Sequence, residues 1–341
     1  MTQASHSIKS ENIYSDFLKD TDWQDCKLQS MGFDMGYRKY FRLDNGERTC
    51  LLMDMSKAGL ECGLDQYVQI DEYLASLNIR VPALYKYDLQ SGFSIIEDLG
   101  STSFGDCLRE GMDRKQFYPI ATKVLIELKD KATQNDLELV PFDRSTPRSK
   151  LDFFAQYYIP AVTRKPFDQN DLYEFNKVLD EVQSAAHPCA KTAALGDYHL
   201  ENLIWMENEP EHYAVIDFQD AFWVQQPYDL VNLLEDARQD VPKDIKRDMY
   251  ELYCENMSAE EKQGFDDWYI ILSMIFHIKV LGQLVKYRKE RGRKEYDSFI
   301  PRLQNYLKKE MEHPLLKPMK NWLSEKQVHF DITLDELFES E

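Results

Sequence analysis

Paired or clustered cysteines are absent from this sequence of 341 residues. Its six cysteines are scattered, with no Cys-x-x-Cys pair and no grouping with the seven histidines. A disulfide framework or a zinc site would need such spacing, so the sequence argues against both. The cysteines indicate a protein of the reducing cytoplasm.

An excess of basic charge is also lacking, because 60 acidic side chains outnumber 41 basic ones and give a net charge of −19. A nucleic acid or an anionic membrane is therefore not expected as a partner. A solvated acidic surface explains the charge, although a cationic substrate would suit it as well.

Long apolar runs are missing too. The first residues lack the apolar core of a signal peptide, and the longest apolar stretch, Trp268 to Leu281, is interrupted by Ser273, His277 and Lys279. That stretch is too short to span a bilayer, so we expect a cytoplasmic protein without a membrane partner. His277 is expected to be a satisfied core or cleft histidine rather than a ligand.

The length and the 43% content of apolar residues allow a large core divided between two lobes or domains. Residues 1–99 are rich in predicted strands, which are Tyr40 to Leu43, Thr49 to Asp54, Leu84 to Tyr87 and Phe93 to Leu99. Asp44-Asn-Gly46 is a hairpin turn signal between the first two. Helices are predicted at residues 10–22 and at Leu64 to Leu77.

Residues 100–341 follow helical periodicity, and the hairpin within 195–220 is the only strand-like interruption expected there. The predicted helices are Phe117 to Ala132, Lys150 to Val162, Asp171 to Ala185, Asp244 to Met257, Phe265 to Arg288 and Ile300 to Met311.

Three oxygen-bearing side chains, Asp197, Asn202 and Asp217, mark the candidate active site. A short hairpin after Asn202 would return Asp217 to the same end. A carboxylate, an amide and a second carboxylate suit phosphoryl transfer on Mg²⁺, because such transfer needs positioning and charge neutralisation. Asp197 would orient the acceptor hydroxyl and take its proton late, while Asn202 and Asp217 would hold Mg²⁺. An isolated Asp and Asn at this spacing would be ordinary turn residues.

The stretch Leu195–Leu230 resembles the catalytic core of the aminoglycoside/choline phosphotransferase family, a branch of the kinase-like fold. The family pattern H-G-D-x-x-x-x-N, followed by I-D-[FW] and a later D-[LI], matches Asp197, Asn202, Asp217 and Asp229, except that Leu195 replaces the His. The resemblance implies an α+β, bilobal, protein-kinase-like fold, with a five-stranded antiparallel small lobe to about residue 99 and a mainly helical large lobe. It makes Asp229 the support of the catalytic loop, and it places ATP between the lobes.

Ile216-Asp-Phe-Gln-Asp-Ala221 and Tyr228 to Asp236 more particularly resemble the bacterial anomeric amino-sugar kinases of cell-wall recycling. These enzymes phosphorylate N-acetylmuramate and N-acetylglucosamine at the anomeric hydroxyl. Arg38-Lys-Tyr-Phe-Arg42 and the pair Met53-Asp54 also match that group, in which Met-Asp stands where kinases carry a strand Lys.

On the nucleotide side, the resemblance places Gly36 in a phosphate-covering loop. It puts Met53 at the position of the strand Lys, and it makes Arg38 and Arg42 the candidates to replace that missing Lys. Glu97 and Leu99 would belong to the hinge that binds adenine through its backbone. A turn at Gly36 and solvated positions for the two arginines are the structural alternatives.

On the acceptor side, the candidates are His199, Glu201, Glu235 and Arg238. Loop polarity and a mixed-charge helix face explain them equally well.

We therefore expect an ATP- and Mg²⁺-dependent kinase of a small-molecule hydroxyl, with the anomeric hydroxyl of an amino sugar as the expected acceptor. The alternatives are an aminoglycoside or choline-type kinase and a nucleotide-binding regulatory protein without catalysis. The sequence leaves the oligomeric state open.

Overall fold

The computed structural model describes residues 13–33, 38–56, 63–134, 137–142 and 149–338. Contacts within the chain define two compact units, and each is described by itself. The first comprises residues 1–112 and 200–220, and the second comprises residues 113–199 and 221–341. This division differs from the predicted change of lobe at residue 99, because it groups residues 100–112 and 200–220 with the strand-rich part.

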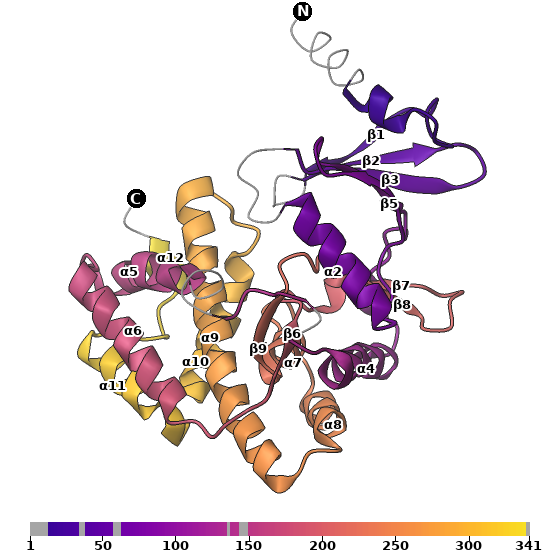
Figure 1. Cartoon of the computed structure of the whole chain (residues 1–341). Coiled ribbons are helices and arrows are strands. Elements are labelled where there is room, and N and C mark those ends of the chain that lie inside the picture. The colour runs from indigo at the N-terminus through magenta and orange to yellow at the C-terminus, as the bar shows by residue number, and fades with distance from the viewer. Residues whose placement is uncertain (1–12, 34–37, 57–62, 135–136, 143–148, 339–341) are drawn as a thin grey trace, which may run out of the picture. The chain divides into compact units, whose positions relative to one another are not determined.

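A five-stranded antiparallel sheet in the order β1-β2-β3-β5-β4 forms the centre of the first unit (Figure 1). Its strands are β1 Gln29–Phe33, β2 Lys39–Asp44, β3 Thr49–Asp54, β4 Leu84–Asp88 and β5 Phe93–Glu97. The predicted small antiparallel sheet is therefore confirmed. Gly36, the residue expected in a phosphate-covering loop, lies outside the described residues.

The turn between β2 and β3 has the predicted chemistry. The side chain of Asp44 accepts a hydrogen bond from the Gly46 amide at 2.8 Å, and Asn45 accepts one from the Arg48 amide at 3.0 Å. Gly46 has a φ of +87°, a conformation that glycine adopts without steric penalty. Local side-chain hydrogen bonds thus fix the register of the hairpin.

The two faces of β3 have different environments, because successive side chains of a strand point to opposite sides. Cys50 and Leu52 pack in an apolar cluster with Tyr14 and Phe17 of the helical residues 13–18. Asp54 shares that face, where its carboxylate accepts a hydrogen bond from the Tyr14 hydroxyl at 2.6 Å. Met53 therefore points to the opposite face of the sheet.

The remaining elements of the first unit are helix α2, Leu64–Ser76, helix α3, Phe104–Arg109, and a hairpin of β7, Leu203–Trp205, with β8, Tyr213–Val215. The helix predicted at Leu64 to Leu77 is confirmed by α2. The ring of Tyr67 on α2 stacks on Phe218 just beyond β8, with centroids 5.2 Å apart. This contact ties the hairpin to α2.

The second unit is mainly helical, as expected. Its α-helices are α4 Arg114–Lys131, α5 Ile159–Thr163, α6 Gln169–Ser184, α7 Pro227–Leu234, α8 Lys243–Cys254, α9 Ala259–Arg291, α10 Ile300–Glu310, α11 Lys317–Glu325 and α12 Leu334–Phe338. The helix predicted at Lys150 to Val162 is composite, because a 3₁₀ turn at Ser149–Leu151 and a π turn at Phe154–Tyr158 precede α5.

One expectation for this part of the chain was wrong. Strands β6, Lys191–Ala194, and β9, Phe222–Gln225, pair in a second two-stranded sheet, so the hairpin of β7 and β8 is not the only strand-like interruption. Each strand has four residues, too few for a period of two to stand out in the sequence. The sheet matters because β6 ends directly before Leu195, Gly196 and the candidate catalytic residue Asp197.

Helix α9 is the central helix of the second unit (Figure 1). By length and composition it could cross a membrane, contrary to the expectation from its apolar stretch, but most of that segment is buried inside the protein. Gly282 allows the close approach of α9 to the π turn, because a Cβ there would lie 2.2 Å from the backbone nitrogen of Phe154. The helix is a core helix of this unit.

His277 on α9 is fully buried and satisfied, as the sequence indicated. Its Nδ1 lies 2.7 Å from the Glu310 carboxylate, and its Nε2 lies 3.1 Å from the carbonyl oxygen of Glu235. Burial alone would disfavour the charged ring, but Glu310 and the Glu235 contacts raise the pKa of His277 above its ordinary value. The pair joins α9 to α10.

We expect the His277–Glu310 pair to stabilise the protein more at low pH than at high pH. The stabilisation is complete below the ordinary histidine pKa and is lost as the pH rises through the raised pKa of the folded state. Urea unfolding of the wild type and of Glu310→Gln should therefore differ more at about pH 6 than at about pH 9. Asp267→Asn, at the exposed His187–Asp267 pair, is the matched control and should show little difference. If wild type and Glu310→Gln differed more in unfolding free energy at high pH than at low pH, the stabilising role of the His277–Glu310 pair would be contradicted.

Candidate active site

The catalytic loop of the second unit is held by Asp229 near the start of α7. One oxygen of the Asp229 carboxylate accepts a hydrogen bond from the Leu195 amide at 2.6 Å, and the other accepts one from the Gly196 amide at 3.1 Å. Gly196 adopts a φ of +89°, so the chain turns sharply before Asp197. A carboxylate thus fixes the backbone immediately before the candidate catalytic residue.

Asp229 is buried, with 4% of its surface exposed. Desolvation raises the pKa of Asp229 to about 6, against the opposing effect of the two backbone hydrogen bonds and of Lys279. Pro227 lies at the beginning of α7, where proline suits the first helical turn, and Asp229 lies in that same turn.

Asp197 itself is exposed, with 55% of its side chain accessible. His199 is buried, and its Nε2 lies 3.3 Å from an oxygen of the Asp197 carboxylate. Partial desolvation would raise the pKa of Asp197, but His199, Arg238 and Lys279 outweigh it and hold that pKa well below its usual range. The carboxylate is therefore ionised at neutral pH and accessible to a ligand.

Asn202 and Asp217 lie in the first unit, at the same end of the hairpin. Leu203 pairs with Val215, and the Ile216 amide donates to the carbonyl oxygen of Asn202 at 3.0 Å. The predicted return of Asp217 beside Asn202 is thus present in the backbone. Asp217 has a φ of +60°, which is uncommon outside glycine and often found at functional sites.

The Asp217 carboxylate accepts hydrogen bonds from Arg38 at 2.7 Å and from the side-chain amide of Gln219 at 2.9 Å, both on Oδ1. Arg38 is 8% exposed, whereas a third of the Asp217 side chain is accessible. An amide oxygen and a carboxylate at one hairpin end are hard donors of the type that Mg²⁺ accepts, with further ligands left to phosphates and water. The residues present therefore fit a magnesium site.

The remaining nucleotide-side candidates lie in the sheet of the first unit. The Arg42 guanidinium forms two hydrogen bonds with the Asp98 carboxylate, at 2.6 and 3.0 Å, and Met53 is fully buried. Arg42 thus contacts Asp98, which lies between the hinge candidates Glu97 and Leu99, rather than Asp217.

The two hinge candidates, Glu97 and Leu99, differ in their hydrogen bonds. The Glu97 carboxylate is paired with Arg80 at 2.7 and 2.8 Å, so its side chain has a structural partner. Among the described residues, the backbone of Leu99 makes no hydrogen bond. Its amide and carbonyl groups are therefore available to a ligand.

Arg80 was missed by the sequence reasoning. It also forms two hydrogen bonds with the Glu209 carboxylate, at 2.7 and 2.8 Å, and its carbonyl oxygen accepts the Val215 amide at 2.8 Å. One guanidinium thus connects the predicted hinge with the hairpin that carries Asn202 and Asp217. A lone Arg in a loop gives no sequence signal of such a role.

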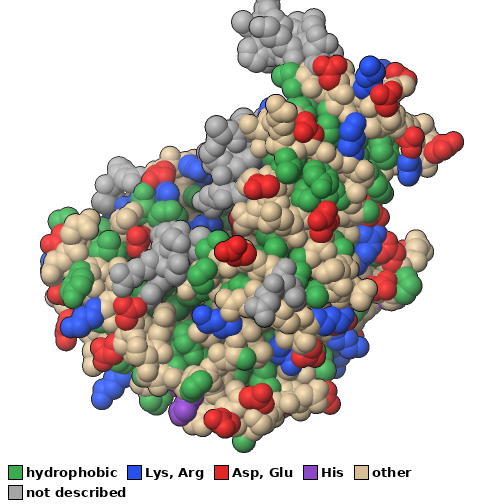
Figure 2. Space-filling model, in the orientation of Figure 1, with side chains coloured by type: hydrophobic (Ala, Val, Ile, Leu, Met, Phe, Trp, Pro, Cys, Tyr) green, Lys and Arg blue, Asp and Glu red, His purple; other side chains and the backbone are tan. Residues whose placement is uncertain are grey.

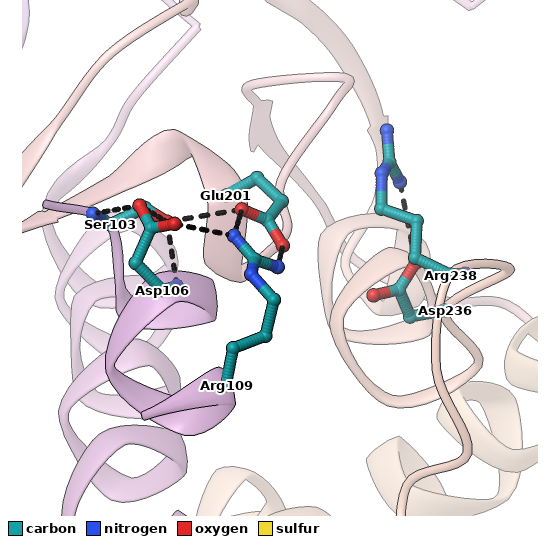
Figure 3. A network of polar contacts seen from close by, with 6 residues as sticks. All are labelled: Ser103, Asp106, Arg109, Glu201, Asp236 and Arg238. Atoms are coloured by element: carbon teal, nitrogen blue, oxygen red, sulfur yellow. Dashed lines mark hydrogen bonds and ion pairs between the residues drawn. The ribbon is translucent and has the colours of Figure 1, made fainter. Parts of the chain in front are cut away.

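Two of the four acceptor-side candidates are occupied by structural contacts. Figure 3 shows Glu201 facing α3, where Arg109 donates to it at 2.6 and 3.0 Å and the Ser103 hydroxyl donates at 3.0 Å. Glu235 is paired with Lys246 and accepts a hydrogen bond from the Tyr269 hydroxyl at 3.2 Å.

The other two acceptor-side candidates are His199, beside Asp197, and Arg238. Arg238 is partly exposed, and its backbone and guanidinium contact the buried Asp236 at 3.0 and 3.3 Å (Figure 3).

Comparison with known proteins decides the family. Residues 22–262, which is most of the chain, match the model of the phosphotransferase enzyme family. The chain belongs to this family. It is a small-molecule kinase, and the predicted family is confirmed.

Curated relatives of this kinase match most of its length. It is 25% identical to the N-acetylmuramate/N-acetylglucosamine kinase of Caulobacter vibrioides over 93% of this chain and 96% of that protein. It is also 25% identical to the protein of the same name from Pseudomonas aeruginosa, over 80% of each chain.

Solved structures show the same fold. The choline kinase LicA from Streptococcus pneumoniae has a TM-score of 0.58 at 13% identity, covering 91% of this chain and 100% of that one. The aminoglycoside phosphotransferase APH(2'')-Ib has a TM-score of 0.55 at 14% identity, covering 87% and 96%. The predicted kinase-like fold is therefore confirmed.

Lys279 on α9 is another residue of the kinase that the sequence reasoning missed. Its ammonium group donates to the Tyr228 hydroxyl at 2.8 Å, next to Asp229. In the sequence, Lys279 is only an interruption of an apolar stretch. A single charge inside an otherwise uncharged, mainly apolar stretch is the signal that could have found it.

We expect Asp229→Ala to destabilise the kinase and to disturb its catalytic loop. The change leaves the two amides of Leu195 and Gly196 without their acceptor, at about 1–3 kcal/mol for each buried group. Urea unfolding should show the loss, and turnover should fall because Asp197 is displaced. Asp248→Ala, on the exposed face of α8, is the control and should change both values little.

Proposed function

We propose that this kinase transfers the γ-phosphoryl group of ATP to the anomeric hydroxyl of an amino sugar, with Mg²⁺ as cofactor. The observation that carries the proposal is the accessible Asp197 carboxylate on a loop fixed by Asp229, in a chain whose curated relatives are named N-acetylmuramate/N-acetylglucosamine kinases.

Asp197 would accept a hydrogen bond from the acceptor hydroxyl and orient its oxygen toward the phosphoryl group. An ionised carboxylate suits this role, and it can take the proton once the attacking oxygen has become acidic. The loop before Asp197 is fixed by Asp229, so little reorganisation is needed when the acceptor binds.

Asn202 and Asp217 would hold Mg²⁺, which supplies positive charge to neutralise the phosphate oxygens. Arg38 contacts Asp217 and would be the cation that replaces the strand Lys, with Met53 at the original position of that Lys. Arg42 forms two hydrogen bonds with Asp98 and would therefore act indirectly, by fixing the hinge. The backbone groups of Glu97 and Leu99 would bind adenine, and Gly36 would cover the phosphates.

The acceptor assignment is supported by the charges around Asp197. The groups that act on it most strongly are the basic side chains of His199, Arg238 and Lys279. A polycationic aminoglycoside would need converging carboxylates there instead. A sugar that is neutral or carries a carboxylate suits this environment better.

The test is an ATP-consumption screen with N-acetylmuramate, N-acetylglucosamine, other hexoses, kanamycin and choline, with phosphorus NMR of each product. The proposal expects an anomeric phosphate on an amino sugar. A phosphate on carbon six, or turnover only with amines, would refute the acceptor assignment. Binding of ATP and Mg²⁺ with no turnover of any acceptor would instead favour a regulatory protein.

A further inference from the structure

Glu201 is the residue directly before Asn202, and its side chain is held by several groups of one helix. It lies in the 3₁₀ turn Leu200–Asn202 of the first unit. Arg109 on α3 donates to both oxygens of the Glu201 carboxylate, at 2.6 and 3.0 Å (Figure 3). The Ser103 hydroxyl, at the N-cap of the same helix, lies 3.0 Å from that carboxylate. The direction of the Glu201 side chain is therefore fixed.

Most charged pairs on this protein need no functional explanation. In Figure 2, acidic and basic side chains are interspersed over the visible surface, as expected for a solvated acidic protein. The Arg109 side chain is itself 59% exposed, and exposed pairs contribute little to stability. Its guanidinium is nevertheless held in place, because it also donates to Asp106 at 2.7 Å. A guanidinium that binds both oxygens of a carboxylate fixes the geometry of the pair, so we expect this pair to affect position more than stability.

Gly105 on α3 provides the space for the Glu201 carboxylate. A Cβ at Gly105 would lie 2.2 Å from an oxygen of this carboxylate and 2.4 Å from its carbon, much closer than unbonded atoms can approach. Gly105 lies within the helix and does not have a positive φ, so its backbone conformation does not require glycine. Glycine is also a poor helix former. The carboxylate that occupies the space explains why this position lacks a side chain.

The backbone on both sides of Asn202 is held as well. The carbonyl oxygen of Asn202 accepts a hydrogen bond from the Ile216 amide at 3.0 Å. Three residues further on, the Trp205 amide of β7 donates to the carbonyl oxygen of Thr102 at 2.8 Å, directly before the N-cap of α3. The contacts of Glu201 fix the residue directly before Asn202. Asn202 therefore lies between two points that are both attached to the start of α3.

We propose that Glu201 is a positioning residue, which Arg109 and Gly105 hold so that the next residue, Asn202, keeps the orientation that binds Mg²⁺. The inference rests on the proposed function, in which Asn202 is a metal ligand, and adds the residues that act on this ligand from α3. A ligand that is ordered before the metal arrives loses less freedom on binding, so the metal binds more tightly. Glu201 acts through its neighbour and is not itself a ligand.

The experiment measures binding of a non-hydrolysable ATP analogue to the full-length protein by calorimetry, with and without Mg²⁺. The main variant is Gly105→Ala, whose new methyl group displaces the Glu201 carboxylate. It should retain α3, because alanine is the better helix former. Arg109→Met removes the two hydrogen bonds to Glu201 by a different route.

Two variants of the same unit serve as matched controls. Gln69→Ala introduces alanine at an exposed position of α2, and Arg48→Met removes another exposed arginine of an ion pair. Neither residue contacts the hairpin that carries the proposed metal ligands in any printed pairing of its own strand or helix, so both should bind the analogue as the wild type does. Thermal unfolding of each variant verifies that it is folded.

The expected result is that Gly105→Ala and Arg109→Met weaken binding of the analogue with Mg²⁺ about tenfold, because residues that orient a metal ligand commonly have effects of this size. Binding without Mg²⁺ should be unchanged. The melting temperature of Gly105→Ala should not fall, which separates positioning from a loss of stability.

If both variants kept the full gain from Mg²⁺ that the wild type shows, the contacts of Glu201 would be structural only and the proposal would be overturned. Equal losses with and without Mg²⁺ would also overturn it, because they would place the effect on the nucleotide and not on the metal. If one of the two variants does not fold, the other decides. A wild type whose binding does not respond to Mg²⁺ would refute the proposed metal site itself, a result distinct from a response that both variants keep.

Discussion

Asp197→Asn is expected to lower kcat by about two to four orders of magnitude, the range of a lost acid–base group. The amide cannot take the proton of the acceptor hydroxyl, although it has nearly the same shape. Nucleotide binding should survive, because Asp197 belongs to the acceptor side of the proposed site. Steady-state kinetics and calorimetry with ATP and Mg²⁺ measure the two effects separately.

The control for this variant is Asp248→Asn, which removes an exposed carboxylate of the same unit that is paired with Arg247. It should retain normal turnover. If Asp197→Asn lost no more than Asp248→Asn, Asp197 would not be the group that holds the acceptor.

Asp217→Ala is expected to weaken metal-dependent nucleotide binding. The change removes a ligand of the proposed magnesium site, and it leaves Arg38 and Gln219 without the oxygen to which both donate. The apparent Kd for ATP with Mg²⁺ should rise about tenfold or more, which is about 1.4 kcal/mol of binding free energy. Calorimetry with and without Mg²⁺ measures this change in Kd.

The effect of Mg²⁺ on nucleotide binding separates a metal-ligand role of Asp217 from a purely structural role. In the wild type, Mg²⁺ should strengthen nucleotide binding, and in Asp217→Ala this gain should disappear. Gln219→Leu removes a neighbouring donor but keeps the carboxylate, so it should preserve most of the gain. A gain from Mg²⁺ that was equal in the wild type and in Asp217→Ala would show that Asp217 is not a metal ligand.

The sequence predicted the elements whose pattern is local. The turn at Asp44 to Gly46 has its own side-chain hydrogen bonds, and the long helices α4, α6, α8, α9 and α10 follow an apolar period that many residues support. The spacing of Asn202 and Asp217 also predicted the hairpin between them, since a few residues of turn are enough to reverse a strand. The short strands β6 and β9 gave no such pattern.

The partners of individual side chains could not be predicted in this way. Glu201 was a candidate for the acceptor and instead contacts Arg109, and Arg42 was a candidate for the nucleotide and instead contacts Asp98. Both are charged residues near a motif, and their sequence neighbourhood does not say which way they point. Packing of separate elements decides that direction.

By itself, the sequence determined the family, the order of the main elements and the motif that carries Asp197, Asn202, Asp217 and Asp229, because motif spacing and periodicity act over a few residues. Only the tertiary structure decided that Arg38 meets Asp217 across 179 positions and that Lys279 meets Tyr228 across 51. Such pairs form when distant segments pack together and bring polar or charged groups into contact, and no local pattern encodes that choice.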